Sequence, residues 1–97
     1  NMEKFLAVFT MKGCPHCDSM KEQLTESGID FIDMDIEENA DEYEVFSKIT
    51  ENDYVPAFMI MEIDENNQEN RNTHLFAPGR DYELIEDGIK IIKEHFN

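Results

Sequence analysis

Hydrophobic positions along the chain form four short runs that predict β-strands. Residues 5–9 are continuously apolar and end at Thr10, which predicts a strand buried on both faces. Residues 30–36 alternate apolar and acidic side chains, a pattern typical of a strand with one solvated face. Two further runs, at residues 55–61 and 75–76, indicate a third and a fourth strand.

Apolar residues at helical spacing predict three helices, over residues 15–27, 39–50 and 81–96. The predicted inner face of the first helix is formed by Cys17, Met20 and Leu24, and that of the second by Tyr43, Phe46 and Ile49. The predicted inner face of the third helix is formed by Leu84, Ile85, Gly88, Ile89, Ile92 and Phe96. Gly28 is the expected C-cap of the first helix. Asn39 with Glu42 resembles a capping box at the start of the second, and Asp81 is the expected N-cap of the third. Gly88 in mid-helix indicates close packing against the sheet.

The order of these elements is βαβ–α–ββα, which predicts an α/β fold with a four-stranded mixed sheet flanked by three helices. Residues 62–72 are almost wholly polar and are predicted to form a solvated connection in a long hairpin. Residues 1–97 are expected to form a single domain. Asn1 precedes Met2 and is interpreted as a remnant of cloning, with Met2 as the native start.

The charge of the chain excludes several classes of partner. It has 8 basic and 23 acidic side chains, for a net charge of −15. Binding of nucleic acid needs a surface of Lys and Arg, so no nucleic-acid partner is expected. No apolar run approaches the roughly 20 residues that span a bilayer, and no secretory signal is found, so a cytoplasmic protein without a membrane partner is expected. The acidic surface is expected to keep the protein a soluble monomer; alternatively, its field attracts basic partner proteins and weakens the capture of small anions.

Both cysteines of the chain lie in one C-x-x-C motif directly after the first strand. Pro15 suits the first turn of a helix, because its missing N–H would have no partner there. Cys14 is therefore expected at the N-cap or just before it, beside free backbone N–H groups and the positive end of the helix dipole. A thiolate is stabilised at such a position, so the pKa of Cys14 is expected to fall below the value of about 8.5 for a free thiol. Cys17 lies one turn further on the same side, where it can attack a mixed disulfide on Cys14.

His16 lies between the cysteines and has two interpretations. It is a tolerated polar residue at a helix start, or its protonated imidazole and ring N–H stabilise the thiolate and make the protein more oxidising. A zinc site is the alternative use of the two cysteines. Tetrahedral zinc needs four ligands, usually as two such pairs, and the chain has no second pair, so no metal site is predicted.

Three segments of the sequence resemble a known family. They are Gly13-Cys14-Pro15-His16-Cys17 after the first strand, Phe31-Ile32-Asp33-Met34-Asp35, and Tyr54-Val55-Pro56-Ala57-Phe58. Over residues 5–96 the chain resembles a dithiol glutaredoxin of the thioredoxin superfamily. The resemblance implies the thioredoxin/glutaredoxin fold, with Cys14 as the nucleophile and Cys17 as the resolving cysteine. It also implies a cis Val55–Pro56 bond, which turns the Val55 backbone toward the sulfur atoms so that a substrate pairs with it as an added strand.

The resemblance further implies a surface that binds glutathione or the substrate, formed by Lys12, Tyr54, Val55, Pro56, Gly79, Arg80 and Asp81. The chain departs from the family pattern near this surface. Met11 stands where glutaredoxins usually have a cation, Asp53 stands where they often have a basic residue, and Pro78 replaces the first residue of a Gly-Gly pair. These changes weaken the expected hold on glutathione, which is an anion with two carboxylates. Lys12 and Arg80 are the cations expected to compensate.

The predicted function is the reduction of protein disulfides, glutathione mixed disulfides or both, through the dithiol of Cys14 and Cys17. Glutathione is the expected co-substrate, no cofactor is expected to be bound, and the expected partners are oxidised or glutathionylated proteins. Three other functions stay open: a thioredoxin-like protein disulfide reductase that does not depend on glutathione, a carrier of a glutathione-ligated iron–sulfur cluster, and a non-catalytic interaction module. Pro15 disfavours the carrier, because the dithiol members that share this proline bind clusters less readily.

Overall fold

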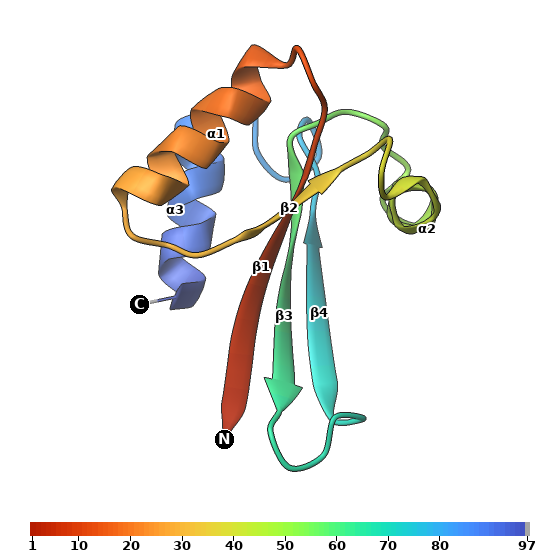
Figure 1. Cartoon of the computed structure of the whole chain (residues 1–97), viewed down its shortest axis with the longest axis vertical. Coiled ribbons are helices and arrows are strands. Elements are labelled where there is room, and N and C mark those ends of the chain that lie inside the picture. Colours follow the sequence, from red (N-terminus) through yellow and green to blue (C-terminus); the bar gives the residue numbers. More distant parts are fainter. Residues whose placement is uncertain (97) are drawn as a thin grey trace.

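A mixed four-stranded sheet with helices on both faces forms the framework of the protein (Figure 1). The computed structural model describes residues 1–96. Its elements are β1 (Met2–Thr10), α1 (Pro15–Glu26), β2 (Ile32–Asp35), α2 (Ala40–Thr50), β3 (Ala57–Asp64), β4 (Arg71–Phe76) and α3 (Ile85–Phe96). This order confirms the predicted βαβ–α–ββα arrangement and the α/β fold with three helices.

β1 lies in the interior of the sheet, whose strand order is β2-β1-β3-β4. It runs parallel to β2 and antiparallel to β3, and β3 runs antiparallel to β4. A parallel pair needs a crossover connection, which α1 provides. Residues 6–10 of β1 are buried, as predicted for a strand covered on both faces, whereas residues 2–5 are exposed. The buried half of β1 therefore leads directly into the C-x-x-C motif.

Helices α1 and α3 cover one face of the sheet (Figure 1). The buried residues of this core are Leu6, Val8, Met20, Leu24, Phe58, Ile60, Tyr82, Ile85, Ile89 and Ile92. The predicted inner face of α1 is confirmed, because Cys17, Met20 and Leu24 are all buried. Full burial of one such aliphatic side chain stabilises the fold by roughly 1.5–3 kcal/mol. This packing fixes α1, and with it both cysteines, against the end of β1.

Helix α2 covers the opposite face (Figure 1). The buried residues of this second core are Phe9, Phe46, Ala57 and Ala77. The rings of Phe9 and Phe46 lie 4.9 Å apart at an angle of 51°, within the range that favours aromatic pairs. The last residues of β1 are thus held from both faces, which gives the cysteine-bearing turn a rigid base.

Two predictions for α2 are wrong. Asn39 donates its side-chain N–H to the carbonyl four residues earlier at 3.0 Å and makes no cap hydrogen bond, so the capping box with Glu42 does not form. Ile49 is 63% exposed, and Thr50 takes its place beside Phe46 on the buried face. The Thr50 hydroxyl donates to the Phe46 carbonyl at 2.8 Å, which allows a polar side chain to be buried there.

Helix α3 begins about one turn later than predicted. Asp81 is not its N-cap, because its carboxylate accepts a backbone N–H four residues earlier, at 2.7 Å, in the preceding turn. Tyr82 enters the core, whereas Leu84 is 62% exposed. Gly88 does pack closely, but against α1 rather than the sheet. A Cβ at this position would lie 3.1 Å from Cε of Met20 and 3.2 Å from the Tyr82 ring.

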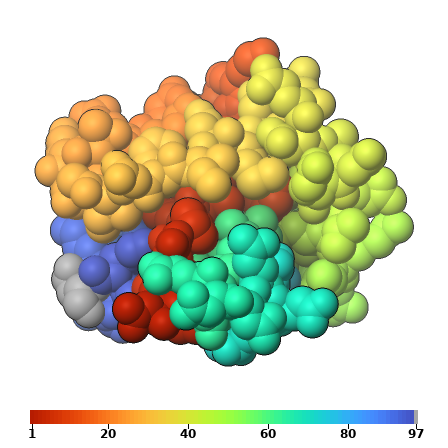
Figure 2. All heavy atoms as spheres, turned by 60° about the horizontal axis from the view of Figure 1, so that its bottom comes forward, coloured from red at the N-terminus to blue at the C-terminus, as the bar shows by residue number. Residues whose placement is uncertain are grey.

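The connection between β3 and β4 is shorter than predicted. β3 continues to Asp64 and β4 begins at Arg71, so strand pairing takes in both ends of the polar stretch 62–72 and leaves residues 65–70 as the connection. Polar residues are tolerated in these strands because the end of β3, residues 62–64, pairs with the exposed start of β1, outside the hydrophobic core. The connection and the N-terminus form one end of the molecule (Figure 2), opposite the start of α1 (Figure 1).

Candidate active site

The start of α1 holds Cys14 in the N-cap position. Its backbone is extended, with φ −108° and ψ 101°, and Pro15 is the first residue of the helix. Gly13 precedes it with a φ of +72°, a left-handed conformation that glycine adopts without strain. The backbone N–H of Cys17 donates to Sγ of Cys14 at 3.2 Å. The predicted N-cap position is confirmed, with a sulfur atom in the role that an oxygen usually has.

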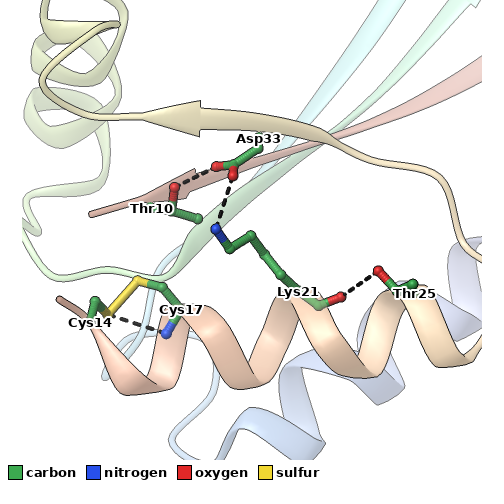
Figure 3. A network of polar contacts seen from close by, with 6 residues as sticks. All are labelled: Thr10, Cys14, Cys17, Lys21, Thr25 and Asp33. Carbon is green, nitrogen blue, oxygen red and sulfur yellow. Dashed lines mark hydrogen bonds and ion pairs between the residues drawn. A yellow bond between two sulfur atoms is a disulfide. The ribbon is translucent and has the colours of Figure 1, made fainter. Parts of the chain in front are cut away.

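Cys14 and Cys17 are joined by a disulfide, with their Cα atoms 5.2 Å apart (Figure 3). Cys14 is 8% exposed and Cys17 is 0% exposed. Of the two cysteines, only Cys14 is therefore reached by a partner in solution. His16 is exposed at the start of α1, and the N–H that reaches the Cys14 sulfur comes from the Cys17 backbone rather than from the imidazole. Tuning by His16 stays a prediction.

The turn before β3 is tied to the segment before α3. The Val55–Pro56 bond is cis, as the resemblance implied. The buried hydroxyl of Tyr82 donates to the Pro56 carbonyl. Burial, together with the negative charge of Asp81, raises the pKa of Tyr82 well above its ordinary range, so this hydroxyl keeps its proton as a donor. The cis-proline turn is thereby held at a fixed position beside α3.

A groove of about 220 Å³ lies where the start of α1, the cis-proline turn and residues 82–86 meet. A more open hollow of about 360 Å³ adjoins it. The predicted site residues that line one or both of them are His16, Tyr54, Val55, Pro56 and Gly79. The fold thus brings together residues that lie up to 63 positions apart in the chain, counted from His16 to Gly79 (79 − 16).

The two cations that were predicted to hold glutathione do not line this groove. Nε of Arg80 donates to the Asp81 carboxylate at 2.9 Å, and Nη2 donates to the Leu75 carbonyl at 2.8 Å, so its charge is paired within the turn. Lys12 lines a separate hollow of about 430 Å³ with Gly13. Binding of glutathione by Lys12, Arg80 and Asp81 stays a prediction.

A polar network that was not predicted lies near the disulfide (Figure 3). The Asp33 carboxylate of β2 accepts hydrogen bonds from the Thr10 hydroxyl and from Nζ of Lys21, the latter at 3.0 Å. Burial acts to raise the pKa of Asp33, but these hydrogen bonds and the charge of Lys21 outweigh it and lower the pKa. The three side chains come from three different elements, so no spacing in the sequence could have identified them.

Within residues 1–96, no three side chains of His, Cys, Asp or Glu lie together in a way that could hold a metal ion. None of the helices described for this part of the chain has the length and the apolar composition needed to cross a membrane.

Comparisons with known proteins agree with this architecture. Residues 6–69, more than half of the chain, match the model of the Glutaredoxin family. The Gene 56 protein of Mycobacterium phage L5 is 36% identical over 44 residues, a segment that covers 45% of this chain and 43% of that protein. This chain therefore matches less than half the length of that curated relative.

Two solved structures are similar to this chain. The crystal structure of a point mutant of the thioredoxin-like protein BC3987 has a TM-score of 0.58 and 14% identity, with coverage of 95% of this chain and 99% of that one. This likeness supports the thioredoxin fold and nothing beyond it. The structure of a malarial protein has a TM-score of 0.44 and 18% identity, with coverage of 97% of this chain and 98% of that one. The fold agrees with the match to residues 6–69, which covers more than half of the chain and shows that the chain belongs to the glutaredoxin family.

Proposed function

We propose that this protein is a glutaredoxin-type thiol–disulfide oxidoreductase, with Cys14 as the nucleophile and Cys17 as the resolving cysteine. The observation that carries the proposal is the position of the Cys14 sulfur, which caps α1 and accepts the backbone N–H of Cys17. In the dithiol form, the same N–H and the helix dipole would stabilise a thiolate. The pKa of Cys14 is therefore expected to lie below the value of about 8.5 for a free thiol.

Reduction of a substrate begins when the Cys14 thiolate attacks one sulfur of the substrate disulfide. A Cys14–substrate disulfide forms, the substrate S–S bond breaks, and the other substrate sulfur leaves as a thiolate that takes a proton from water. Cys17 then loses its proton and attacks the Cys14 sulfur, which releases the first substrate sulfur. The substrate gains two electrons, and the protein is left with the Cys14–Cys17 disulfide.

Recycling of the protein requires an external thiol, for which we propose glutathione. Two glutathione molecules would reduce the Cys14–Cys17 disulfide and form oxidised glutathione. The exchange needs only sulfur atoms, so no bound cofactor is part of the proposal. The proposed setting is the cytoplasm, whose thiol pool keeps cysteines reduced, and the proposed partners of the monomer are oxidised or glutathionylated proteins.

A second candidate is a thioredoxin-like reductase that does not depend on glutathione. Three observations favour it. Arg80 is paired with Asp81, and Lys12 lies outside the groove beside Pro56. The first turn of α3 carries Glu86 and Asp87, which repel an anion from a helix N-terminus that would otherwise attract it. The family match also ends at residue 69, before the turn that the resemblance assigns to glutathione.

Cysteine variants test the proposed reaction. Cys17→Ser should still turn over glutathionylated substrates, because glutathione itself can resolve the intermediate on Cys14, but it should lose activity on protein disulfides. Cys14→Ser should lose both activities. Rates with a glutathionylated peptide and with oxidised insulin measure the two reactions. Equal loss of both activities in Cys17→Ser would contradict the proposed division of roles.

A separate comparison identifies the source of electrons. Turnover of a glutathione mixed disulfide that is coupled to glutathione reductase supports the glutaredoxin type. Insulin reduction with dithiothreitol, in the absence of glutathione-coupled turnover, supports the second candidate. A visible absorption band in the purified protein that is lost in Cys14→Ser would instead support an iron–sulfur cluster carrier.

A further inference from the structure

The groove beside the cis-proline turn is lined by acidic side chains and by no lysine or arginine. Glu83 and Glu86 line it and are exposed, and no Lys or Arg does. Neither carboxylate belongs to any of the four ion pairs formed within residues 1–96. His16 is the one side chain of the lining that can carry a positive charge. The groove therefore offers two carboxylates that are free to meet a cation.

We infer that this groove selects protein substrates with a lysine or arginine next to the reacting cysteine, and that Glu83 and Glu86 are the specificity-determining residues. The inference rests on the proposed exchange at Cys14, because it concerns the substrate that reacts there. The acidic side chains fit the charged head of a lysine or arginine, and the apolar residues of the groove fit its aliphatic stem.

Apolar residues of the groove fit the stem of such a side chain. Val55, Pro56, Leu84 and Ile85 line it together with the two carboxylates. Leu84 is largely exposed, so the free protein leaves apolar surface uncovered at this place. Lys and Arg bury an aliphatic stem along apolar surface and keep the charged head in water, where a carboxylate can meet it. A chain segment that carries an acidic residue at the same place would meet repulsion from both glutamates.

The adjoining hollow continues the same surface. It shares Val55 and Glu83 with the groove and adds Tyr54, which is 70% exposed. Asp53, the residue next to Tyr54, adds a further negative charge at this turn and is also exposed. An extended substrate segment that lies across Val55 would therefore meet negative charge from Glu83 and Glu86 in the groove and from Asp53 at the turn.

The expected preference is modest, because both carboxylates are exposed. Ion pairs at exposed positions change an equilibrium by about 1.5-fold to fivefold each. We therefore expect Glu83 and Glu86 together to favour a lysine-flanked substrate over a glutamate-flanked one by about threefold to tenfold at low ionic strength. The preference should shrink as salt is added, because exposed charges are screened.

Matched peptides test the inference. Three peptides share one cysteine, held as a mixed disulfide with thionitrobenzoate, and differ only in its two neighbours, which are Lys, Gln or Glu. Release of the coloured thiol gives the second-order rate constant with the dithiol protein, and division by the rate with dithiothreitol removes intrinsic differences between the peptides. The Lys-to-Glu ratio of the wild-type protein should fall about threefold to tenfold in Glu83→Gln/Glu86→Gln.

A control separates the groove from the overall negative charge. Glu65→Gln/Glu69→Gln removes two carboxylates from the β3–β4 connection, at the far end of the molecule from the start of α1 (Figure 1). This variant should keep the wild-type ratio. A ratio near one in the wild-type protein, or an equal fall in both double variants, would overturn the inference.

A second measurement does not depend on exchange. The oxidised protein is titrated with the same peptides carrying serine in place of cysteine, and amide NMR signals are followed. The Lys peptide should shift the signals of Val55, Glu83 and Glu86 more than the Glu peptide does, and this difference should vanish in Glu83→Gln/Glu86→Gln. If these shifts appear but no peptide disulfide is reduced, the proposed reaction fails while the binding preference stands. If the peptide disulfides are reduced but neither the rates nor the NMR shifts favour the Lys peptide, the inference fails and the proposed reaction stands.

Discussion

At the scale of single residues, the hydroxyl of Tyr82 has a structural role that can be isolated. It donates to the carbonyl of Pro56, which lies 26 residues earlier in the chain. Tyr82 is almost fully buried and Pro56 is buried as well, so removal of this hydroxyl takes away the hydrogen-bond partner of a carbonyl on a buried residue. A buried carbonyl without a partner costs roughly 1–3 kcal/mol. The contact thus supports both the fold and the position of the cis-proline turn.

We expect Tyr82→Phe to lower the free energy of unfolding by about 1–3 kcal/mol at neutral pH. The variant should also change the alkaline limb of the stability profile. Burial, with the charge of Asp81, raises the pKa of Tyr82, so the folded protein keeps a proton that the unfolded chain releases above about pH 10. The contribution of this residue is complete below that pH and is lost as the pH rises further.

Urea unfolding between pH 7 and pH 11 measures both effects. Tyr54→Phe is the matched control, because Tyr54 is exposed and its loss of a hydroxyl should leave stability within about 0.5 kcal/mol of the wild type. A Tyr82→Phe variant as stable as Tyr54→Phe, with the wild-type alkaline profile, would contradict the role described for this hydroxyl.

At the scale of elements, the crossing of α1 and α3 depends on Gly88. A Cβ atom there would lie within 3.2 Å of both Met20 and the Tyr82 ring. Alanine is the better helix former by about 1 kcal/mol, but the ring of Tyr82 is held by its hydrogen bond and Met20 is buried. Gly88→Ala should therefore lower the free energy of unfolding, by about 1–3 kcal/mol, as an overpacked core does.

Lys90→Ala is the control for this prediction, because residue 90 is an exposed position of the same helix. Its stability should stay within about 0.5 kcal/mol of the wild type. Chemical denaturation of the three proteins gives the comparison. A Gly88→Ala protein that is more stable than the wild type would show that helix propensity outweighs packing at this crossing.

The buried face of α2 gives a second prediction at this scale. Phe46 is buried against Phe9, whereas Ile49 is exposed. Phe46→Ala should lower the free energy of unfolding by about 3–5 kcal/mol, and Ile49→Ala by less than about 0.5 kcal/mol. The ratio of the two changes, measured by urea unfolding, tests the orientation of the helix. Comparable losses would indicate that Ile49 faces the core after all.

The sequence was sufficient for the identity and order of the elements, but not for their ends. Hydrophobic periodicity located all four strands and three helices, because each buries one continuous face. The ends depend on contacts between distant residues. Asp81 looked like an N-cap but accepts the N–H of Ala77 in a turn, and Thr50 is buried because its hydroxyl finds a carbonyl within its own helix. Neither contact changes the spacing of hydrophobic residues in the sequence, so neither could be predicted from it.

At the scale of the whole molecule, charge is the dominant feature. The net charge of −15 lies on only 97 residues, so repulsion between carboxylates opposes the compact state. Salt screens this repulsion. Moderate concentrations of sodium chloride should therefore raise the melting temperature, by about 4 °C or more for each 1 kcal/mol of repulsion relieved. The midpoint of a thermal melt at low and moderate salt tests this, and a midpoint that falls with salt would contradict it.

In the candidate site, too, local features could be predicted from the sequence, and contacts between distant residues could not. The positions of Cys14 and Pro15 at the helix start followed from local backbone chemistry, which acts over a few residues. The cis Val55–Pro56 bond followed from the family resemblance. The carboxylates of the groove could not be predicted, since Glu83 and Glu86 lie about 70 residues after His16 in the chain and meet the start of α1 only in the folded protein.

The unequal burial of the two cysteines has a consequence for kinetics. Cys17 is fully covered, so in the proposed exchange an oxidised substrate and a reducing thiol both have to react at Cys14, one after the other and at the same place. The first product must leave before the second reactant can bind, so no complex of the protein with both the oxidised substrate and the reducing thiol can form. Steady-state rates measured at several fixed concentrations of the thiol should then give parallel lines in double-reciprocal plots. At high concentration, the substrate should competitively inhibit the reaction with the thiol, and the thiol should competitively inhibit the reaction with the substrate.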